Sequence, residues 1–175
     1  QVLVEVGIST AFGCTLQGAV PEDDVVRLAE RLVQAGVDEA GLSDTTGMAN
    51  PAQVRRLFQR VRSAIGGHTG AAHLHNTRGL GLANCLAAHD VGVRSFDASL
   101  AGLGGCPYAP GASGNVVTED LVFMFEAMGV HTGIDLNRLF AARAPLRAGL
   151  PGEVLYGMTP EAGLPPGWTQ EAAHG

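Results

Sequence analysis

Two histidines separated by a single residue, His73 and His75, have the residue type and the spacing to do chemistry. Residues two apart on a β-strand point to the same side of a sheet, so both imidazoles can be directed at one point in space. Neutral imidazole is the commonest metal ligand among protein side chains. The pair therefore predicts a metal site at the end of a strand.

A glycine-rich segment at positions 104–115 supplies a thiol, Cys106, and an amide, Asn115. Glycine has no Cβ and adopts conformations that other residues avoid, so the backbone and a small nucleophilic side chain can approach a ligand closely there. A reactive cysteine fits this setting. Taken alone, Cys106 would more often be an inert packing residue.

These side chains need strands to position them, and the chain alternates short β-branched runs with helical patterns, as parallel βα units do. In the register that we expect, every polar cluster follows the carboxyl end of a strand, the face on which barrel enzymes place their chemistry. Those clusters are Cys14, Asp44, the two histidines, and Cys106 with Asn115. We predict strands at 2–8, 37–43, 71–75 and 93–99, with helices beginning near Pro21, Asn50 and Thr118 and a further helix ending near Val91.

The chain has 175 residues, whereas a complete (β/α)8 barrel typically needs roughly 250. We therefore expect an α/β fold of the TIM-barrel type in which residues 1–150 form about four βα units, the C-terminal half of a barrel. Residues 151–175 are rich in Pro and Gly and are predicted to be a tail. Because the first residues enter a strand-like run directly, we expect the sequence to begin partway through a longer polypeptide.

Composition excludes several kinds of partner. The formal charge is −6 and all 11 basic residues are arginine, which argues against nucleic acid and anionic membranes because both need a basic surface. No apolar run approaches the length of a membrane span. Three cysteines without a Cys-x-x-Cys spacing predict neither a disulfide framework nor a zinc knuckle. A small-molecule partner and a cytoplasmic location fit best.

Three segments, at 72–84, 97–115 and 118–122, together resemble 3-hydroxy-3-methylglutaryl-CoA (HMG-CoA) lyase, a member of the DRE-TIM metallolyases. The resemblance covers roughly residues 2–139. The block Gly-Leu-Gly-Gly-Cys-Pro-Tyr-Ala at 102–109 is close to diagnostic of the lyase, whereas His-x-His followed by Asn-x-x-Gly is shared with related synthases and aldolases.

The resemblance implies a metal site and an activity. It implies that His73, His75 and Asn115 bind Mg²⁺ or Mn²⁺, that Cys106 is the catalytic thiol, and that Asp44 is a functional aspartate. Cys106, His73 and Asp44 are thus the expected catalytic residues. The implied substrate is an acyl-CoA, HMG-CoA or a close 3-hydroxyacyl-CoA, cleaved to acetyl-CoA and acetoacetate. The family's first-strand Asp-Arg-Glu motif has no counterpart here.

Alternatives stay open at the level of the whole chain. The chain could belong to a related aldolase or Claisen-type synthase, or it could be a catalytically incomplete half-barrel with a structural or assembly role. Exposed edges of a parallel sheet are costly, so we expect unseen residues, the tail or a second subunit to cover them, and we expect a homo-oligomer, dimer or higher.

Alternatives also stay open for single residues. Asp44 could only cap a turn. Arg78 could reach a CoA phosphate, although a solvated surface position is the simpler expectation, and Glu119 and Asp120 are most simply first-turn helix acids. Cys14 and Cys85 are expected to be packing residues.

Overall fold

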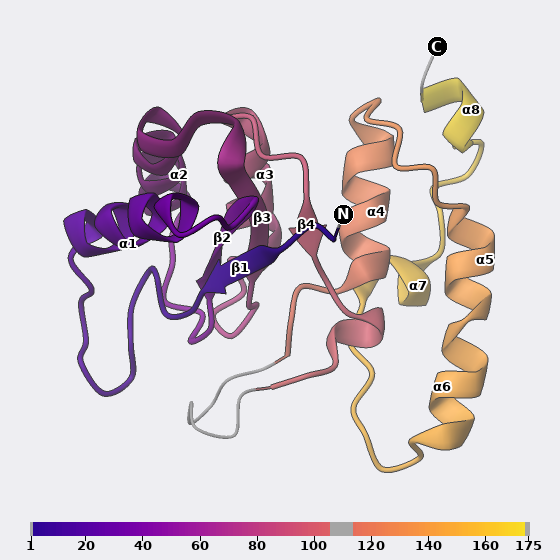
Figure 1. Cartoon of the computed structure of the whole chain (residues 1–175). Helices are drawn as coiled ribbons and strands as arrows, with labels where there is room; N and C mark the ends of the chain where they lie inside the picture. The colour runs from indigo at the N-terminus through magenta and orange to yellow at the C-terminus, as the bar shows by residue number, and fades with distance from the viewer. Residues whose placement is uncertain (1, 106–113, 174–175) are drawn as a thin grey trace.

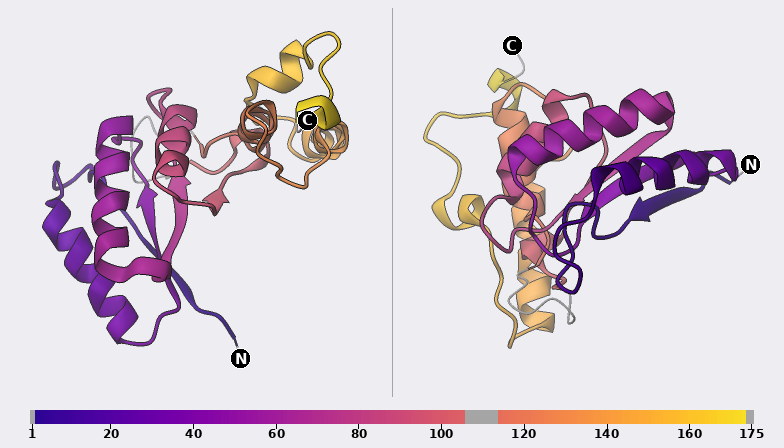
Figure 2. Two further views of the ribbon diagram at one scale, coloured as in Figure 1. Left: turned by 90° about the horizontal axis from the view of Figure 1, so that it is seen from above. Right: turned by 90° about the vertical axis from the view of Figure 1, so that its left-hand side faces the viewer.

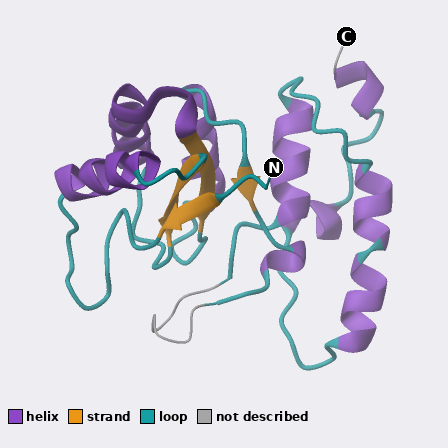
Figure 3. Ribbon diagram, viewed as in Figure 1, coloured by secondary structure: helices purple, strands orange, loops and turns teal. Residues whose placement is uncertain are grey.

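The computed structural model describes residues 2–105 and 114–173. Its sheet has four parallel strands in the order β1-β2-β3-β4, and helices alternate with them along the chain (Figure 1, Figure 3). The predicted βα alternation is therefore confirmed. The strands are β1 (Glu5–Ile8), β2 (Glu39–Asp44), β3 (Thr69–Leu74) and β4 (Phe96–Asp97), and the helices between and after them are α1 (Glu22–Gln34), α2 (Pro51–Ile65), α3 (Gly81–Asp90) and α4 (Thr118–Ala127).

Helices α1, α2 and α3 lie over one face of the sheet (Figure 2). The core forms between this face and the helices, where removal of apolar surface from water drives folding. Its fully buried side chains come from the alternate positions of β2 and β3 that face the helices and from the apolar stripe of α2. They include Leu42, Val54, Leu57, Phe58, Val61 and Leu74.

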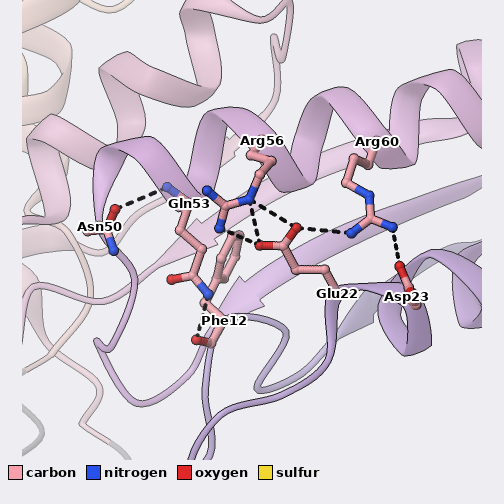
Figure 4. Close-up of polar contacts among 7 residues, drawn as sticks. All are labelled: Phe12, Glu22, Asp23, Asn50, Gln53, Arg56 and Arg60. Carbon is pink, nitrogen blue, oxygen red and sulfur yellow. Dashed lines mark hydrogen bonds and ion pairs between the residues drawn. The ribbon is translucent and has the colours of Figure 1, made fainter.

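The starts of two helices agree with the sequence. Asn50 caps α2 because its side chain accepts a hydrogen bond from the backbone N–H of Gln53 (3.0 Å), and Pro51 occupies the first helical position. The Gln53 side chain then donates to the carbonyl of Phe12 (3.0 Å), which ties α2 to the loop after β1 (Figure 4). The predicted start of α4 at Thr118 is likewise confirmed.

An ionic contact joins α1 to α2. Glu22, in the first turn of α1, accepts hydrogen bonds from Arg56 (2.6 Å) and Arg60 (3.1 Å) on α2 (Figure 4). The hydrogen bond from Arg56 is the main reason that the pKa of Glu22 lies below its usual range. This contact links the first turn of α1 to α2 at the surface of the protein.

Strand register separates the two faces of the sheet. Ser43 of β2 pairs with His73 of β3, and His73 pairs with Asp97 of β4. Successive side chains of a strand point to opposite faces, so these three residues share the face that α1–α3 do not cover. Leu42, Asp44 and Leu74 belong to the opposite face, and all three are fully buried.

Strand β4 is shorter than the predicted 93–99 because another segment enters beside it. The backbone N–H of Val116 donates to Leu74 (3.1 Å), and the N–H of Ser99 donates to Val116 (3.1 Å). Residues 114–117 therefore lie between the ends of β3 and β4, where direct pairing of the two strands would otherwise continue.

At the amino ends of β2 and β3, on the face that α1–α3 do not cover, the backbones of the two strands approach each other closely. The pairing of β2 with β3 has an irregularity in register. At this point the backbone N–H of Ala71 donates a hydrogen bond to the carboxylate of Glu5 on β1 (2.9 Å). Glu5 reaches across β2 because Gly41 and Gly70 carry no side chain. A Cβ on Gly41 would lie 2.6 Å from the Ala71 carbonyl oxygen, and one on Gly70 would lie 2.9 Å from the Gly41 nitrogen.

The C-terminal part of the chain packs beside α4, away from α1 (Figure 1). It contains four helices for which the sequence patterns made no prediction. None of the helices in the two described ranges is long and apolar enough to cross a membrane. The four helices are α5 (Leu136–Ala141), α6 (Arg143–Gly149), α7 (Met158–Ala162) and α8 (Gln170–Ala173).

Within the segment 151–175, expected to be a tail, the start of α7 is attached to α4. Both carboxylate oxygens of Asp120 accept backbone N–H groups at the start of α7, from Met158 (2.9 Å) and Thr159 (2.7 Å). Most of the Pro and Gly residues of this segment lie in turns and loops around the short helices α7 and α8.

Candidate metal centre

The two histidines come together at the carboxyl end of β3. Nε2 of His73 lies 3.3 Å from Nε2 of His75. His75 is buried with 5% of its surface exposed, whereas the side chain of His73 is 35% exposed. The expectation that both imidazoles converge on one point is confirmed.

An aspartate contacts the far side of the first imidazole. Nδ1 of His73 lies 3.3 Å from Oδ2 of Asp97. A carboxylate at that position favours the tautomer with the proton on Nδ1, which leaves the lone pair of Nε2 directed toward His75. Metal-binding histidines commonly have such a carboxylate partner. Asp97 was not among the residues expected to have a role, because its position opposite His73 depends on the register between β3 and β4.

Backbone pairing holds Asn115 next to His75. The N–H of Asn76 donates to Gly114 (3.2 Å), and the N–H of Val116 donates to Leu74 (3.1 Å). His75 and Asn115 thereby form an antiparallel bridge. Two residues distant in sequence are thus placed side by side by the chain's return from the glycine-rich segment.

The Asn115 side chain is oriented by two carbonyl groups. Its Nδ2 donates to the backbone oxygens of Leu103 (2.9 Å) and Gly104 (3.3 Å). Its other polar atom, Oδ1, is buried and has no hydrogen-bond partner in the described part of the chain. A buried carbonyl oxygen without a partner is costly unless a ligand completes it.

The residues present fit a divalent cation. Two imidazole nitrogens bound at a right angle to one ion, each about 2.1 Å away, would be about 3 Å apart, close to the separation of the two Nε2 atoms. An amide oxygen is a suitable third donor for Mg²⁺ or Mn²⁺. No cluster of three His, Cys, Asp or Glu side chains that could hold a metal occurs within residues 2–105 and 114–173. Cys106 lies outside the described residues.

Asp44 sits at the end of β2, but on the buried face. Its Oδ1 accepts the N–H of Met48 (2.8 Å) and its Oδ2 accepts the N–H of Ala49 (3.1 Å). Burial raises the pKa of this carboxyl above its usual range. These contacts are those of a turn cap, and a catalytic role for Asp44 stays a prediction.

The loop after Asp44 is hydrogen-bonded to the loops that follow β1 and β3. Thr46 donates through its hydroxyl to the carbonyl of Gly13 (3.0 Å), and Arg78 donates to the carbonyls of Thr46 (3.1 Å) and Gly47 (2.9 Å). Arg78 is exposed, as expected, and one of its guanidinium nitrogens makes both of these contacts. It fixes the loop between β2 and α2 against the loop between β3 and α3.

Two hollows are relevant to a ligand. One of about 220 Å³ adjoins the candidate metal centre, and its lining includes Asn115, Thr77 and Tyr156. A larger one of about 590 Å³ lies between α6 and α7 and is lined by Arg143 and Arg147. The lining of the first includes a candidate metal ligand, Asn115.

The two remaining cysteines differ. Cys85 is fully buried, and burial raises the pKa of its thiol to about 12. Cys14 is partly exposed, and hydrogen bonds from the backbone of Gln17 and Leu16 hold the pKa of its thiol below the usual range. The expectation of a packing role is confirmed for Cys85 and is wrong for Cys14.

Glu119 and Asp120 do more than occupy the first turn of α4. Both are buried. Glu119 accepts hydrogen bonds from Arg143 (2.5 Å) and from the backbone N–H of Ala101 (3.0 Å to Oε2), while Asp120 holds the start of α7. The only sequence signal for these contacts was the pair of adjacent acids shortly after Asn115. Their partners lie too far along the chain to be predicted from residue spacing.

Comparison with protein families matches residues 1–145 to the HMGL-like family. The chain belongs to the HMGL-like family. Enzymes of this family are metal-dependent in general. The matched range includes His73, His75 and Asn115, and it agrees with the extent of the resemblance found in the sequence.

Individual relatives are lyases that act on CoA thioesters. The chain is 49% identical over 158 residues to (R)-citramalyl-CoA lyase of Chloroflexus aurantiacus, covering 90% of this chain and 50% of the relative. It is 46% identical over 135 residues to hydroxymethylglutaryl-CoA lyase YngG of Bacillus subtilis, covering 77% and 45%. The chain thus spans about half the length of the curated relatives it matches.

Solved structures confirm the fold class. An HMG-CoA lyase from Acinetobacter baumannii, in complex with coenzyme A and 3-methylmalate, matches with a TM-score of 0.87 and 47% identity, covering 94% of this chain and 54% of that one. The four parallel βα units of this HMGL-like chain therefore correspond to about half of a TIM-barrel lyase.

Proposed function

We propose that this HMGL-like chain is part of a divalent-metal-dependent lyase that cleaves a carbon–carbon bond in a 3-hydroxyacyl-CoA. The observation that carries the proposal is the 3.3 Å separation of the His73 and His75 Nε2 atoms beside an Asn115 whose buried Oδ1 has no hydrogen-bond partner among residues 2–105 and 114–173. The proposed substrate is HMG-CoA, which would give acetyl-CoA and acetoacetate.

His73, His75 and Asn115 would hold the cation, Mg²⁺ or Mn²⁺. When bound, the cation supplies Lewis-acid polarisation of the substrate's hydroxyl and carboxylate oxygens. Asp97 keeps the His73 proton on Nδ1, and the carbonyls of Leu103 and Gly104 keep the Asn115 amide turned so that Oδ1 is available. These contacts preorganise the donor set before substrate arrives.

Cleavage next to a tertiary alcohol requires two proton movements. The hydroxyl proton passes to a base, the carbon–carbon bond breaks, and its electron pair becomes the enolate of acetyl-CoA. Cys106 is proposed to protonate the enolate carbon, because a thiol with an ordinary pKa of about 8.5 can act as acid or base near neutral pH.

A second substrate is favoured by one specific observation. The match to (R)-citramalyl-CoA lyase extends over 158 residues, so it must include part of the segment after residue 150. Tyr156 in that segment lines the hollow that adjoins Asn115. Citramalyl-CoA differs from HMG-CoA by one methylene between the tertiary alcohol and the free carboxylate, a difference that a nearby side chain could discriminate.

The test is release of acetyl-CoA from each of the two thioesters with added Mn²⁺ or Mg²⁺. It uses the chain as given and a form extended to the length of its relatives. His75→Ala and Cys106→Ala should each abolish turnover, and a chelator should do so reversibly. His68→Ala serves as the matched control, since His68 is an exposed histidine whose ring contacts only the backbone carbonyl of Asp38 in the described structure.

Each outcome separates hypotheses. Metal binding without turnover of either thioester in the extended form would favour a related aldolase or Claisen-type synthase. Activity that survives His75→Ala would eliminate the proposed metal site. Activity confined to the extended form would mean that the chain alone is a catalytically incomplete half-barrel. We retain homo-oligomerisation and a cytoplasmic location as proposals, to be tested by solution mass and by fractionation.

A further inference from the structure

A buried ion pair links the C-terminal helices to α4. Nη1 of Arg143, the first residue of α6, donates to Oε1 of Glu119 (2.5 Å) and to the carbonyl of Tyr156 (2.8 Å). The Arg143 and Glu119 side chains are 6% and 0% exposed. Removal of one partner would leave an uncompensated buried charge, so the two groups constrain each other's position.

Glu119 in turn holds a strained turn. Its carboxylate accepts the backbone N–H of Ala101 with both oxygens (3.2 and 3.0 Å). Ala101 has a φ of +55°, a left-handed conformation that is unfavourable for a residue with a side chain. The carbonyl of Ala101 accepts the N–H of Tyr156 (2.9 Å), so the turn is held from both sides. Strain of this kind persists only where surrounding contacts over-determine it.

The strained turn leads directly to the groups that orient Asn115. Leu103 and Gly104, whose carbonyls accept the Asn115 amide, follow Gly102 in the chain. Gly114 packs so closely on Gly102 that a Cβ on Gly114 would lie 1.5 Å from the Gly102 carbonyl oxygen. A displacement of the turn would therefore reach Asn115 by two routes, through its side-chain acceptors and through the residue before it.

We propose that Arg143 is a positioning residue for Asn115, acting through Glu119 and the turn at Ala101. As a contribution to cation binding, this inference rests on the proposed function. Arg143 touches none of the candidate metal ligands, and it lies on a helix that the sequence analysis did not foresee. Its effect is to keep the left-handed turn in place, and with it the orientation of the Asn115 amide.

The experiment measures two quantities in the full chain, Mn²⁺ affinity by calorimetry and the side-chain amide resonances of Asn115 by ¹H–¹⁵N NMR. Arg143→Ala should weaken Mn²⁺ binding about tenfold or more, the range found when outer contacts of metal ligands are lost. It should also shift the Asn115 amide resonances. Arg143→Lys, which keeps the charge beside Glu119, should restore part of both. Arg147→Ala is the matched control, because Arg147 is on the same helix and 68% exposed.

A second variant covers the case in which Arg143→Ala does not fold. Glu119→Asp keeps the charge of the buried pair but withdraws the acceptor from Ala101, so it should weaken binding and shift the same resonances. Wild-type affinity and unshifted resonances in either folded variant would overturn the inference and leave the proposed function intact. If the wild type bound no Mn²⁺, the proposed metal site would fail, and unshifted Asn115 resonances would then reject the positioning role independently.

Discussion

Nδ1 of His73 lies 3.3 Å from Oδ2 of Asp97, and the two residues pair in register between β3 and β4. A strand that contributes only two residues to the sheet thus supplies the carboxylate that sets the tautomer of a candidate metal ligand. The contact makes Asp97 the most direct test of whether the histidine pair serves a cation.

Asp97→Asn should weaken Mn²⁺ binding about tenfold, because an amide stabilises the Nδ1 proton of His73 less than a carboxylate does. Calorimetric titration would measure the effect. Asp90→Asn is the control, since it removes a carboxylate that pairs with Arg55 on the helical surface. Equal affinities in the wild type and in Asp97→Asn would mean that Asp97 does not act on the metal site.

Asp44→Asn should lower the free energy of unfolding by about 1–3 kcal/mol, because an amide cannot accept the N–H groups of both Met48 and Ala49. Urea denaturation measures this. A turn cap predicts that kcat per folded molecule is unchanged, whereas a catalytic aspartate predicts a large fall in kcat without a matching loss of stability. The variant therefore decides between the two roles that the sequence left open.

The same variant should change how stability depends on pH. Burial raises the pKa of Asp44 in the folded state above the unfolded value of about 3.9. Protonation of Asp44 thus contributes stability that is fully present below about pH 4 and is lost as pH rises through the raised pKa. Asp44→Asn lacks this loss, so the difference in unfolding free energy between wild type and variant should shift in favour of the variant as pH rises from 3 to 7. A constant difference in unfolding free energy across that range would contradict the raised pKa.

Gly47→Ala should destabilise the protein by more than Gly18→Ala. Both glycines have a positive φ, +61° and +78°, so both substitutions carry a conformational cost of about 1–2 kcal/mol. A Cβ at Gly47 would also lie 2.5 Å from Cβ of Thr77, whereas nothing lies within 4 Å at Gly18. The overlap should add about 1–3 kcal/mol. Thermal unfolding of the two variants would test the difference. Equal losses of stability would show that the loop containing Thr77 moves to accommodate the new Cβ.

Iodoacetamide at pH 8 should modify Cys14 much faster than Cys85. The thiolate is the reactive form, and the pKa is lowered at Cys14 but raised to about 12 at Cys85 by burial. Peptide mapping by mass spectrometry distinguishes the two sites in the native protein. Similar rates at both sites would mean that the packing around Cys85 opens readily, and denatured protein provides the reference for full access.

The sequence predicts the meeting of His73 and His75 correctly because the placement of the two imidazoles depends on short-range rules. The two-residue period of a strand brings His73 and His75 together, and the parallel order of βα units brings the loops to one edge. The insertion of Asn115 between β3 and β4 follows from neither rule. It rests on backbone pairing between segments about forty residues apart, which one sequence expresses only through a family resemblance.

Longer-range polar contacts could not be predicted from the sequence, for a different reason. Glu119 and Arg143 form a pair only because the C-terminal helices fold back against α4, and nothing in the spacing of the two residues specifies that arrangement. Asp44 shows the converse case. It was predicted to follow a strand and is instead the last residue of β2. A shift of one residue decides which face of the sheet it occupies, and a prediction of strand ends cannot resolve such a shift.

The carboxylate of Glu5 crosses β2 to reach Ala71, and this contact should make Glu5, Gly41 and Gly70 evolve together. Gly41 and Gly70 must stay without side chains for the strands and the carboxylate to fit together, so a change at either glycine should be tolerated only alongside changes at its neighbours. Aligned homologues should therefore gain or lose Glu5, Gly41 and Gly70 as a set. Such co-inheritance would allow related chains to be recognised from the end of the sheet opposite His73 and His75.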